Sequence, residues 1–241
     1  MSIPKKIHYC WFGKKTLPPL AQKCIASWKK YLPDYELILW NEKNFDININ
    51  QYVKEAYLSQ KFAFVTDYVR LYALYNYGGI YMDTDVEVLK PLDKFLEHRA
   101  FTGCESEKMC VTGIIASEQN HPWIEVLLNY YKEKNFILPN GKLDTIPNTE
   151  VITKLTIEKY GWIPKNELQI LNNGLYIYPF NVFCAKNYQT GKVTITDETY
   201  TIHHFSGSWV PKSNKIKSKI IKILGPNVTN FILKYKNKLV R

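Results

Sequence analysis

The sequence contains no CxxC pair, and its five cysteines are an odd number in a chain of 241 residues. This usage argues against a disulfide framework or a zinc site and is typical of a reducing compartment. The absence of any GxG triplet argues against dinucleotide-dependent chemistry. No uncharged apolar run is long enough to cross a bilayer, and the opening MSIPKKIHYCWFGKK lacks the features of a signal peptide. We therefore expect a cytoplasmic protein.

The excess of positive charge is confined to the C-terminal end. Residues 212–241 hold eight Lys, one Arg and no acidic residue, whereas residues 1–211 hold 23 basic and 22 acidic residues, so the two parts carry +9 and +1 of the total +10. A body with almost no net charge does not favour nucleic-acid binding. Since the chain is long enough for one substantial core, we expect a globular domain over residues 1–211 and a separate basic segment over residues 212–241.

Hydrophobic periodicity and turn residues predict alternating strands and helices. Gly78-Gly79 is expected to end one helix, and Thr66 or Asp67 is expected to cap its N-terminus. The alternation predicts an α/β fold with a largely parallel central sheet. The expected strands are residues 7–12, 35–40 and 80–82, and the expected helices are residues 19–31, 51–59, 64–77 and 150–160.

Asp83 and Asp85 directly follow the apolar strand in NYGGIYMDTDVEV, residues 76–88. In an open α/β sheet, ligands bind at the carboxyl ends of the strands. If the strand continues, the two side chains share one face because they are two residues apart. Paired carboxylates suit Mg²⁺ or Mn²⁺, which also bind diphosphates. A solvated acidic turn is the alternative interpretation.

Asp67 and Arg70 lie three positions apart on the preceding helix and therefore project from one face of it. One interpretation is an exposed ion pair that contributes about 0.5 kcal/mol. The other is a functional pair, in which Arg70 binds a phosphate or sugar and Asp67 accepts a hydrogen bond from a sugar hydroxyl.

These motifs carry a family resemblance. TDYVR (66–70) and ALYNYGGIYMDTDVEV (73–88) resemble the DXD-containing sugar transferases of glycosyltransferase family 32, which include yeast initiating α-mannosyltransferases and bacterial capsule enzymes and are related to the clostridial glucosylating toxins. The resemblance implies a GT-A fold, with one catalytic domain over residues 1–211. It extends to IPKKIHYCWFG (3–13), FTGCE (101–105), VTGIIAS (111–117), NHPW (120–123) and HHFSGSW (203–209).

The resemblance implies a role for each matching residue. Asp85 is expected to bind the metal directly, Asp83 to touch the donor ribose or the ion, and His204 to complete the metal site. Because neighbours on a strand point oppositely, only one of His203 and His204 can face the ion. The remaining expected donor contacts are Asp67 and Arg70 on the sugar, Trp11 stacked on the base, and Ser208 and Trp209 over the β-phosphate and leaving oxygen. A core position is the alternative for Trp11.

The implied activity is retaining transfer of a hexose, either glucose, galactose or an N-acetyl form, from a UDP-sugar to a glycan acceptor with Mn²⁺ or Mg²⁺. No second carboxylate is clearly placed as a nucleophile, so front-face attack by the acceptor hydroxyl is the preferred route. Bacterial capsule or surface-polysaccharide assembly is the expected setting, and no nucleic-acid partner is expected.

The basic segment, residues 212–241, interleaves Lys with Ile, Leu and Phe. This composition suits peripheral binding to an anionic membrane surface, where each charge contributes about 1 kcal/mol. The acceptor would then be a lipid-linked oligosaccharide at the inner leaflet. A solvated packing helix is the alternative.

Two other classes of function remain open. A strand ending in DxD also opens the haloacid-dehalogenase-like phosphatases, although their pattern requires Thr or Val where this chain has Glu87. A catalytically silent nucleotide- or glycan-binding module is the second, although the intact set of acidic residues and Arg70 argues against it.

Overall fold

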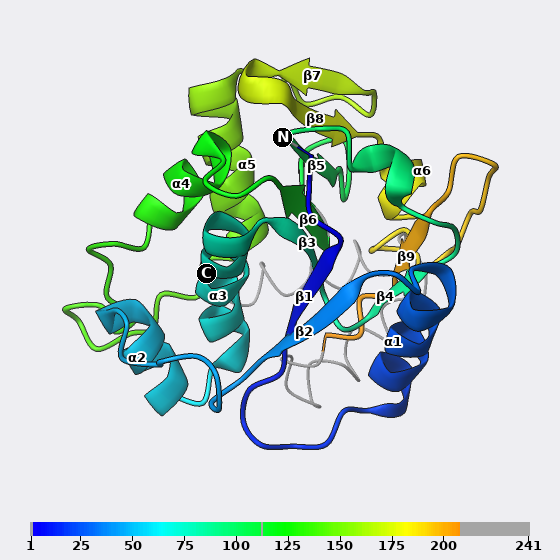
Figure 1. Cartoon of the computed structure of the whole chain (residues 1–241). Coiled ribbons are helices and arrows are strands. Elements are labelled where there is room, and N and C mark those ends of the chain that lie inside the picture. Colours follow the sequence, from blue (N-terminus) through cyan, green and yellow to red (C-terminus); the bar gives the residue numbers. More distant parts are fainter. Residues whose placement is uncertain (1, 112, 208–241) are drawn as a thin grey trace, which may run out of the picture.

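The structure is a computed structural model that describes residues 2–207 except residue 112 (Figure 1). Ser208, Trp209 and the basic segment lie outside the described residues. The strands are β1 (Lys6–Cys10), β2 (Glu36–Trp40), β3 (Gly79–Met82), β4 (Val86–Val88), β5 (Ala100–Gly103), β6 (Ile114–Ser117), β7 (Gln169–Leu171), β8 (Leu175–Tyr178) and β9 (Thr201–His203). The helices are α1 (Pro19–Tyr31), α2 (Gln51–Leu58), α3 (Phe62–Tyr77), α4 (Pro122–Asn129), α5 (Asn148–Tyr160) and α6 (Phe180–Phe183).

Seven strands form one sheet in the order β2-β1-β3-β6-β5-β8-β7. β1 is parallel to β2 and β3, and β5 is parallel to β8. β6 is antiparallel to β3 and β5, and β7 is antiparallel to β8. Five strands therefore point one way, which confirms the predicted α/β fold with a mostly parallel sheet. The carboxyl ends of β1, β3 and β5 consequently meet at one edge.

Helices cover both faces of this sheet, as Figure 1 shows. Side chains of β3 alternate between two hydrophobic cores, with Tyr81 in the core beneath α2, α3, α4 and α5 and with Ile80 and Met82 in the core that includes residues of α1 and α6. Successive strand residues point to opposite faces, so a strand that is buried throughout requires apolar cover on both sides. This explains why IYM reads as a continuous apolar run.

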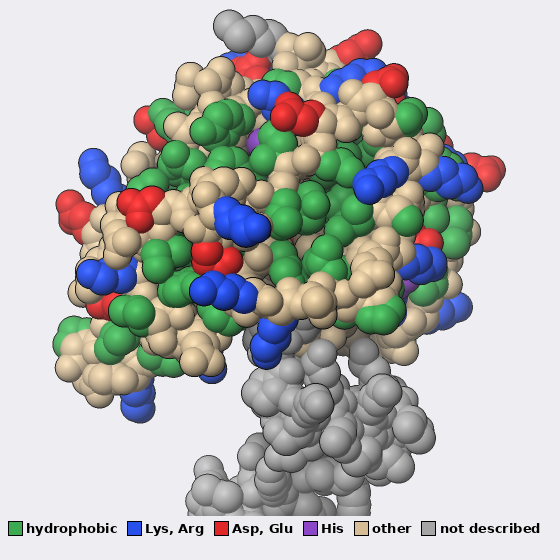
Figure 2. Space-filling model, turned by 60° about the horizontal axis from the view of Figure 1, so that its bottom comes forward, with side chains coloured by type: hydrophobic (Ala, Val, Ile, Leu, Met, Phe, Trp, Pro, Cys, Tyr) green, Lys and Arg blue, Asp and Glu red, His purple; other side chains and the backbone are tan. Residues whose placement is uncertain are grey.

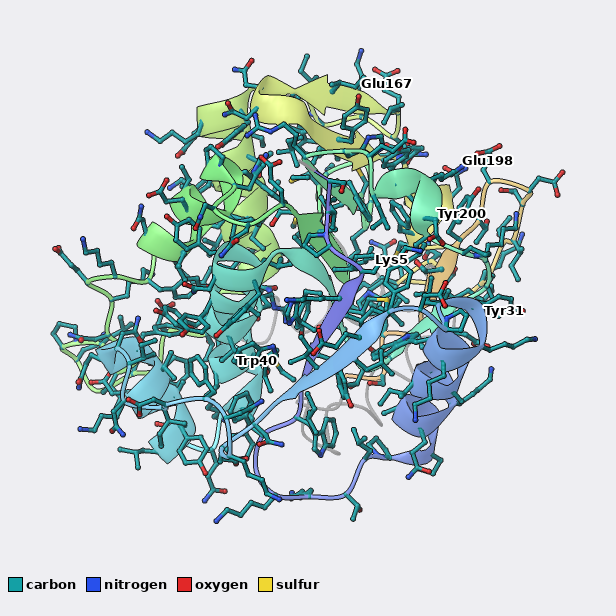
Figure 3. The ribbon with its side chains drawn as sticks, in the orientation of Figure 1. Lys5, Tyr31, Trp40, Glu167, Glu198 and Tyr200 are labelled. Carbon is teal, nitrogen blue, oxygen red and sulfur yellow. The ribbon has the colours of Figure 1, made fainter. Side chains whose placement is uncertain are left out.

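Trp40, the last residue of β2, fixes the junction between the sheet and α3. Its ring is directed towards α3, with its centroid 6.0 Å from that of Tyr72 (Figure 3). Trp40 Nε1 donates to His8 Nδ1 at 3.1 Å, so His8 Nε2 carries the ring proton and donates to Gly78 O at 2.8 Å. Burial lowers the pKa of His8, which favours this neutral form.

The start of α3 differs from the prediction. The helix begins at Phe62 with Lys61 at the N-cap, so Thr66 and Asp67 lie inside it and neither is its cap. The hydrophobic residues Phe62 and Phe64 pack against the core and extend the helix by two residues at its start. Asp67 is consequently carried into the interior. The predicted end is correct, since Gly78 has a φ of 60° and a Cβ there would meet Gln119 N at 2.8 Å.

A second, two-stranded antiparallel sheet is formed by β4 and β9. α1 supports β4 through two hydrogen bonds: Trp28 Nε1 donates to Val86 O at 2.7 Å, and Val88 N donates to Ser27 Oγ at 2.9 Å. Trp28 is fully buried. The turn that carries the two aspartates is therefore held between the end of β3 and a strand anchored to α1.

On the face drawn in Figure 2, basic and acidic side chains are interspersed rather than gathered by sign. This agrees with the net charge of +1 on residues 1–211. Among the described residues, no helix has both the length and the apolar character needed to cross a membrane.

We expect Trp28→Phe to lower the free energy of unfolding by about 1–3 kcal/mol, because it keeps most of the buried ring but leaves the buried Val86 carbonyl without its donor. Urea unfolding followed by circular dichroism measures this loss. Trp11→Phe is the matched control, since Trp11 Nε1 donates to the carbonyl of the exposed Lys15. Equal losses in the two variants would show that the buried hydrogen bond has no special weight.

Candidate active site

The two aspartates of the motif lie in a tight turn between β3 and β4. Val86 N donates to Asp83 O at 3.0 Å, and Asp83 N donates to Gly113 O at 2.8 Å. The strand therefore does not continue through Asp85, and the expectation that the two carboxylates share one strand face is wrong. The turn brings them together instead, with Asp85 buried and Asp83 half-buried.

A histidine from β9 completes the cluster. β4 and β9 pair so that Val86 stands opposite His203. His203 Nε2 is 3.4 Å from Asp85 Oδ1 and 3.9 Å from Asp83 Oδ2. One ligand atom from each of these three residues lies within 4.8 Å of the other two. Carboxylate oxygens and imidazole suit Mn²⁺ or Mg²⁺, so the chemistry and spacing of the three side chains fit a divalent cation.

His204, the histidine expected in the metal site, lies elsewhere. Its Nε2 is 2.8 Å from Glu87 Oε2, and Lys23 Nζ lies 2.9 Å from the same carboxylate. Neighbouring residues on a strand point to opposite sides, and the pairing of β9 with β4 directs His203 towards the aspartates. Of the two histidines, His203 lies at the aspartates and His204 lies at Glu87, so the structure does not bring His204 to the cluster for which it was predicted.

The chain turns sharply after His204 and closes over Asp85. Ser206 N donates to Asp85 Oδ2 at 2.6 Å, and His204 N donates to Asp85 O at 2.9 Å. Phe205 between them has a φ of 53°, a left-handed conformation that is unusual for a bulky residue. Local strain of this kind is frequent where a chain is held at a functional site.

His203 and Asp85 each stabilise the charged form of the other. Burial alone would raise the pKa of Asp85, but its hydrogen bonds with His203 and Ser206 outweigh burial and hold this pKa well below its usual range. Burial would lower the pKa of His203, yet the adjacent carboxylates raise it well above its usual value. Without a cation the imidazole is therefore protonated and pairs with the aspartates. A bound cation would take the place of that proton.

Arg70 on α3 lies between Asp67 and Asp83 and contacts both carboxylates. Its Nη2 is 3.2 Å from Asp67 Oδ1 and 3.3 Å from Asp83 Oδ1, and its guanidinium lies 4.6 Å from the centre of the Tyr81 ring. Tyr81 OH also donates to Asp83 Oδ1, at 2.9 Å. Asp67 and Arg70 are both buried, so the interpretation as an exposed ion pair is wrong. These contacts occupy Asp83 Oδ1, whereas Oδ2 is the atom closest to His203.

A pocket of about 350 Å³ adjoins the cluster. Trp11 is half-buried and lines this pocket instead of lying wholly in the core, and its Nε1 donates to Lys15 O at 2.6 Å. An aromatic ring and a carboxylate thus face one hollow, which is the arrangement expected if a base stacks on Trp11. The lining residues are Trp11, Lys15, Thr16, Pro18, Leu20, Ala21, Thr84, Asp85 and Ser206.

Two further residues at the cluster were not singled out from the sequence. Gly113 approaches so closely that a Cβ would meet both Asp83 Oδ2 and His203 Cδ2 at 3.2 Å. Glu105 follows β5, and burial raises its pKa, with a further contribution from the charge of Asp83. The sequence could have indicated Glu105, because this residue follows β5 and because β3 and β5 end at the same edge of the sheet.

The structure thus brings Asp67, Arg70, Asp83 and Asp85 together and places Trp11 in the adjoining pocket. The fold and this arrangement define an α/β protein with a carboxylate–imidazole site beside a pocket of about 350 Å³. Residues 18–102 match the profile of a family described as "Glycosyltransferase sugar-binding region containing DXD motif". This match supports the expected resemblance to the DXD-containing sugar transferases, and the mixed α/β fold with a mostly parallel sheet is consistent with it.

Two curated proteins and one solved structure are similar to parts of this chain. Inositol phosphoceramide mannosyltransferase 3 of Schizosaccharomyces pombe is 28% identical over 134 residues, which are 51% of this chain and 35% of that protein. Uncharacterized glycosyltransferase L373 of Acanthamoeba polyphaga mimivirus is 27% identical over 226 residues, or 87% of this chain and 84% of that protein. Among solved structures, PaToxG Glycosyltransferase is 20% identical with a TM-score of 0.48 over 66% of this chain and 69% of that chain. The chain spans about a third of the length of the yeast relative.

We expect Asp67 to make stability depend on pH. Burial raises its pKa from 3.8 to about 7, although the charge of Arg70 opposes this. Between these values the folded protein keeps a proton that the unfolded chain has lost, so the stability that Asp67 contributes is present below about pH 4 and is lost as the pH rises to about 7.

Urea unfolding at half-unit steps of pH tests this expectation. The free energy of unfolding of the wild type minus that of Asp67→Asn should fall over the interval by an amount on the order of a few kcal/mol. Asp34→Asn, at an exposed turn, controls for the loss of any carboxylate. Parallel curves for wild type and Asp67→Asn would contradict the expectation.

Proposed function

We propose that this protein is a metal-dependent, retaining glycosyltransferase that moves a hexose from a nucleoside-diphosphate sugar to a glycan acceptor. The observation that carries the proposal is the cluster of Asp83, Asp85 and His203 at the rim of the pocket lined by Trp11. The match of residues 18–102 to the DXD-containing sugar transferases supports it further.

Asp83, Asp85 and His203 would hold Mn²⁺ or Mg²⁺. The bound ion supplies positive charge that compensates the diphosphate leaving group. Trp11 stacks on the nucleotide base, a contact that contributes about 1–3 kcal/mol. Arg70 contacts Asp67 and Asp83 and would orient both side chains. It would also add a fixed positive charge close to the diphosphate.

We propose that Asp67 accepts a hydrogen bond from a hydroxyl group of the donor sugar. The accepting atom would be Oδ2, because Oδ1 is the oxygen that contacts Arg70. Ser208 and Trp209 are proposed to lie over the β-phosphate and the leaving oxygen, on the resemblance alone, since both fall outside the described residues. We propose front-face attack by the acceptor hydroxyl with retention of configuration. Detection of a sugar covalently bound to an aspartate or glutamate would overturn this route.

UDP is the proposed carrier, with glucose, galactose or their N-acetyl forms as the sugar. The relatives named inositol phosphoceramide mannosyltransferases make GDP-mannose the donor to test beside them. Their names also point to an acceptor whose hydroxyl belongs to a lipid head group. This supports a lipid-linked acceptor at the cytoplasmic face of the membrane, in capsule or surface-polysaccharide assembly.

The basic segment, residues 212–241, would hold the catalytic domain at such a surface through its nine positive charges. We expect flotation of the full chain with vesicles that contain anionic phospholipid, and a loss of at least tenfold when the chain ends at residue 211. Neutral vesicles are the control. Equal flotation of the two proteins would remove the membrane proposal and leave the transferase proposal untouched.

The central experiment is a screen of UDP- and GDP-sugars for hydrolysis with Mn²⁺. We expect Asp85→Asn to lower turnover at least 100-fold, because Asp85 contributes both a ligand and a charge to the cluster. Glu87→Gln is the matched control, since Glu87 lies two residues on and pairs with Lys23 and His204 instead. The screen also includes p-nitrophenyl phosphate as a phosphatase substrate. If the protein hydrolysed this compound and no nucleotide sugar, the result would favour a phosphatase.

A second matched pair tests the corrected metal ligand. His203→Ala should weaken Mn²⁺ binding, measured by electron paramagnetic resonance of the free ion, far more than His204→Ala does. Binding of nucleotide without any turnover in the wild type would favour the silent binding module.

A further inference from the structure

The loop between β1 and α1, residues 11–18, forms one wall of the pocket that adjoins the aspartates (Figure 1). Trp11 lies at its start and is the residue proposed to stack on the nucleotide base. The described chain over this stretch forms neither helix nor strand, so individual hydrogen bonds must set its conformation. The position of the Trp11 ring therefore depends on what holds the loop.

Two hydrogen bonds of Trp11 fix the start of the loop. Trp11 N donates to Trp40 O at 3.0 Å, which joins the loop to the end of β2. Trp11 Nε1 donates to Lys15 O at 2.6 Å. The indole N–H thus has its acceptor within the loop, so the ring offers a ligand its face rather than this donor. The contact requires the chain to fold back between Trp11 and Lys15.

Gly13 and Lys14 fold the chain back. Gly13 has a φ of 90° and Lys14 a φ of 58°, so two successive residues lie in the left-handed region. A Cβ at Gly13 would lie 2.4 Å from the Phe62 ring, so the turn packs closely against the first residue of α3. A positive φ is unfavourable for lysine, and contacts elsewhere in the turn must offset its cost.

Glu42, two residues after β2, makes the contact that holds the turn. Its Oε1 accepts from Gly13 N at 2.7 Å and from Tyr57 OH at 3.2 Å, which joins the turn to α2. Burial would raise the pKa of Glu42, but hydrogen bonds, including those from Gly13 and Tyr57, outweigh burial and lower it. The carboxylate is therefore charged at neutral pH. A hydrogen bond to an ionised acceptor is roughly twice as strong as one between neutral groups.

We propose that Glu42 is a positioning residue that holds Gly13 and so keeps the Trp11 ring in the orientation that stacks on the nucleotide base. This inference rests on the proposed nucleotide-sugar-dependent function. Glu42 is not one of the described residues that line the pocket, so it acts through the loop and not by touching the nucleotide. Its removal would release the turn, and the Lys15 carbonyl would no longer restrain the indole.

The test measures binding of UDP and of GDP to the full chain with Mn²⁺, by isothermal titration calorimetry. For the nucleotide that binds more tightly, we expect Glu42→Ala to raise the dissociation constant about tenfold, since it removes a hydrogen bond to a charged group. Glu42→Gln keeps Oε1 as an acceptor and should bind within about threefold of the wild type.

Glu55→Ala is the matched control. Glu55 on α2 also accepts a hydrogen bond from a backbone N–H, that of Ile137 at 2.8 Å, and hydrogen bonds lower its pKa as they do that of Glu42. Ile137 belongs to a segment that does not line the pocket. Glu55→Ala should therefore bind the nucleotide as the wild type does.

A double-mutant cycle separates positioning of Trp11 from a structural role. Trp11→Ala alone should weaken binding about 5–150-fold, the range that stacking of one base supplies. If Glu42 acts through Trp11, adding Glu42→Ala to Trp11→Ala should weaken binding by less than about twofold further. A structural role alone predicts a lower midpoint of thermal unfolding for Glu42→Ala with unchanged affinity of the folded protein.

The outcomes separate this inference from the proposed function. Unchanged binding in Glu42→Ala, additive losses in the cycle, or an equal loss in Glu42→Gln refutes the role of Glu42 and leaves the proposed function standing. If Glu42→Ala does not fold, Glu42→Asp takes its place, because it keeps the charge and withdraws the carboxylate from Gly13 N by one methylene. A wild type that binds neither nucleotide overturns both.

Discussion

The arrangement of this site depends on the buried ion pairs that Arg70 makes with Asp67 and Asp83. The guanidinium lies between these two carboxylates, with the Tyr81 ring beside it. Carboxylates seldom remain charged in an interior unless a cation compensates them, and removal of one partner of a buried ion pair commonly costs about 3–5 kcal/mol. Arg70 therefore permits two acidic side chains to approach the core. It also fixes which oxygen of Asp83 faces the cluster.

Strand direction is the second constraint. Because β1, β3 and β5 end at one edge, Trp11, Asp83 and Glu105 follow them on the same side of the sheet. β9 then adds to β4 and brings His203 to residues more than a hundred positions earlier in the chain. The strained turn at Phe205 returns the backbone to Asp85. The strand directions, the pairing of β9 with β4 and the turn at Phe205 each restrict the positions of the cluster's side chains before any ligand binds. Electrostatic stabilisation of a leaving group requires such preorganisation.

The family match and the geometry support the proposal in different ways. The matched family region, residues 18–102, contains Asp67, Arg70, Asp83 and Asp85 but neither Trp11 nor His203. Those two residues enter through the structure, one as part of the pocket and the other as part of the cluster.

Local sequence determined much of the fold. Helical periodicity predicted α1 and α2 nearly to the residue and the C-terminal end of α3, and the alternation of elements predicted the α/β class, because these features depend on neighbours within a few positions. The four charged residues of the motif were also identifiable, since their spacing is local. Only the tertiary structure decided that the aspartates lie in a turn, that Arg70 is buried, and that His203 and not His204 lies beside the aspartates. Those outcomes depend on strand register and on contacts between distant segments, which no local pattern encodes.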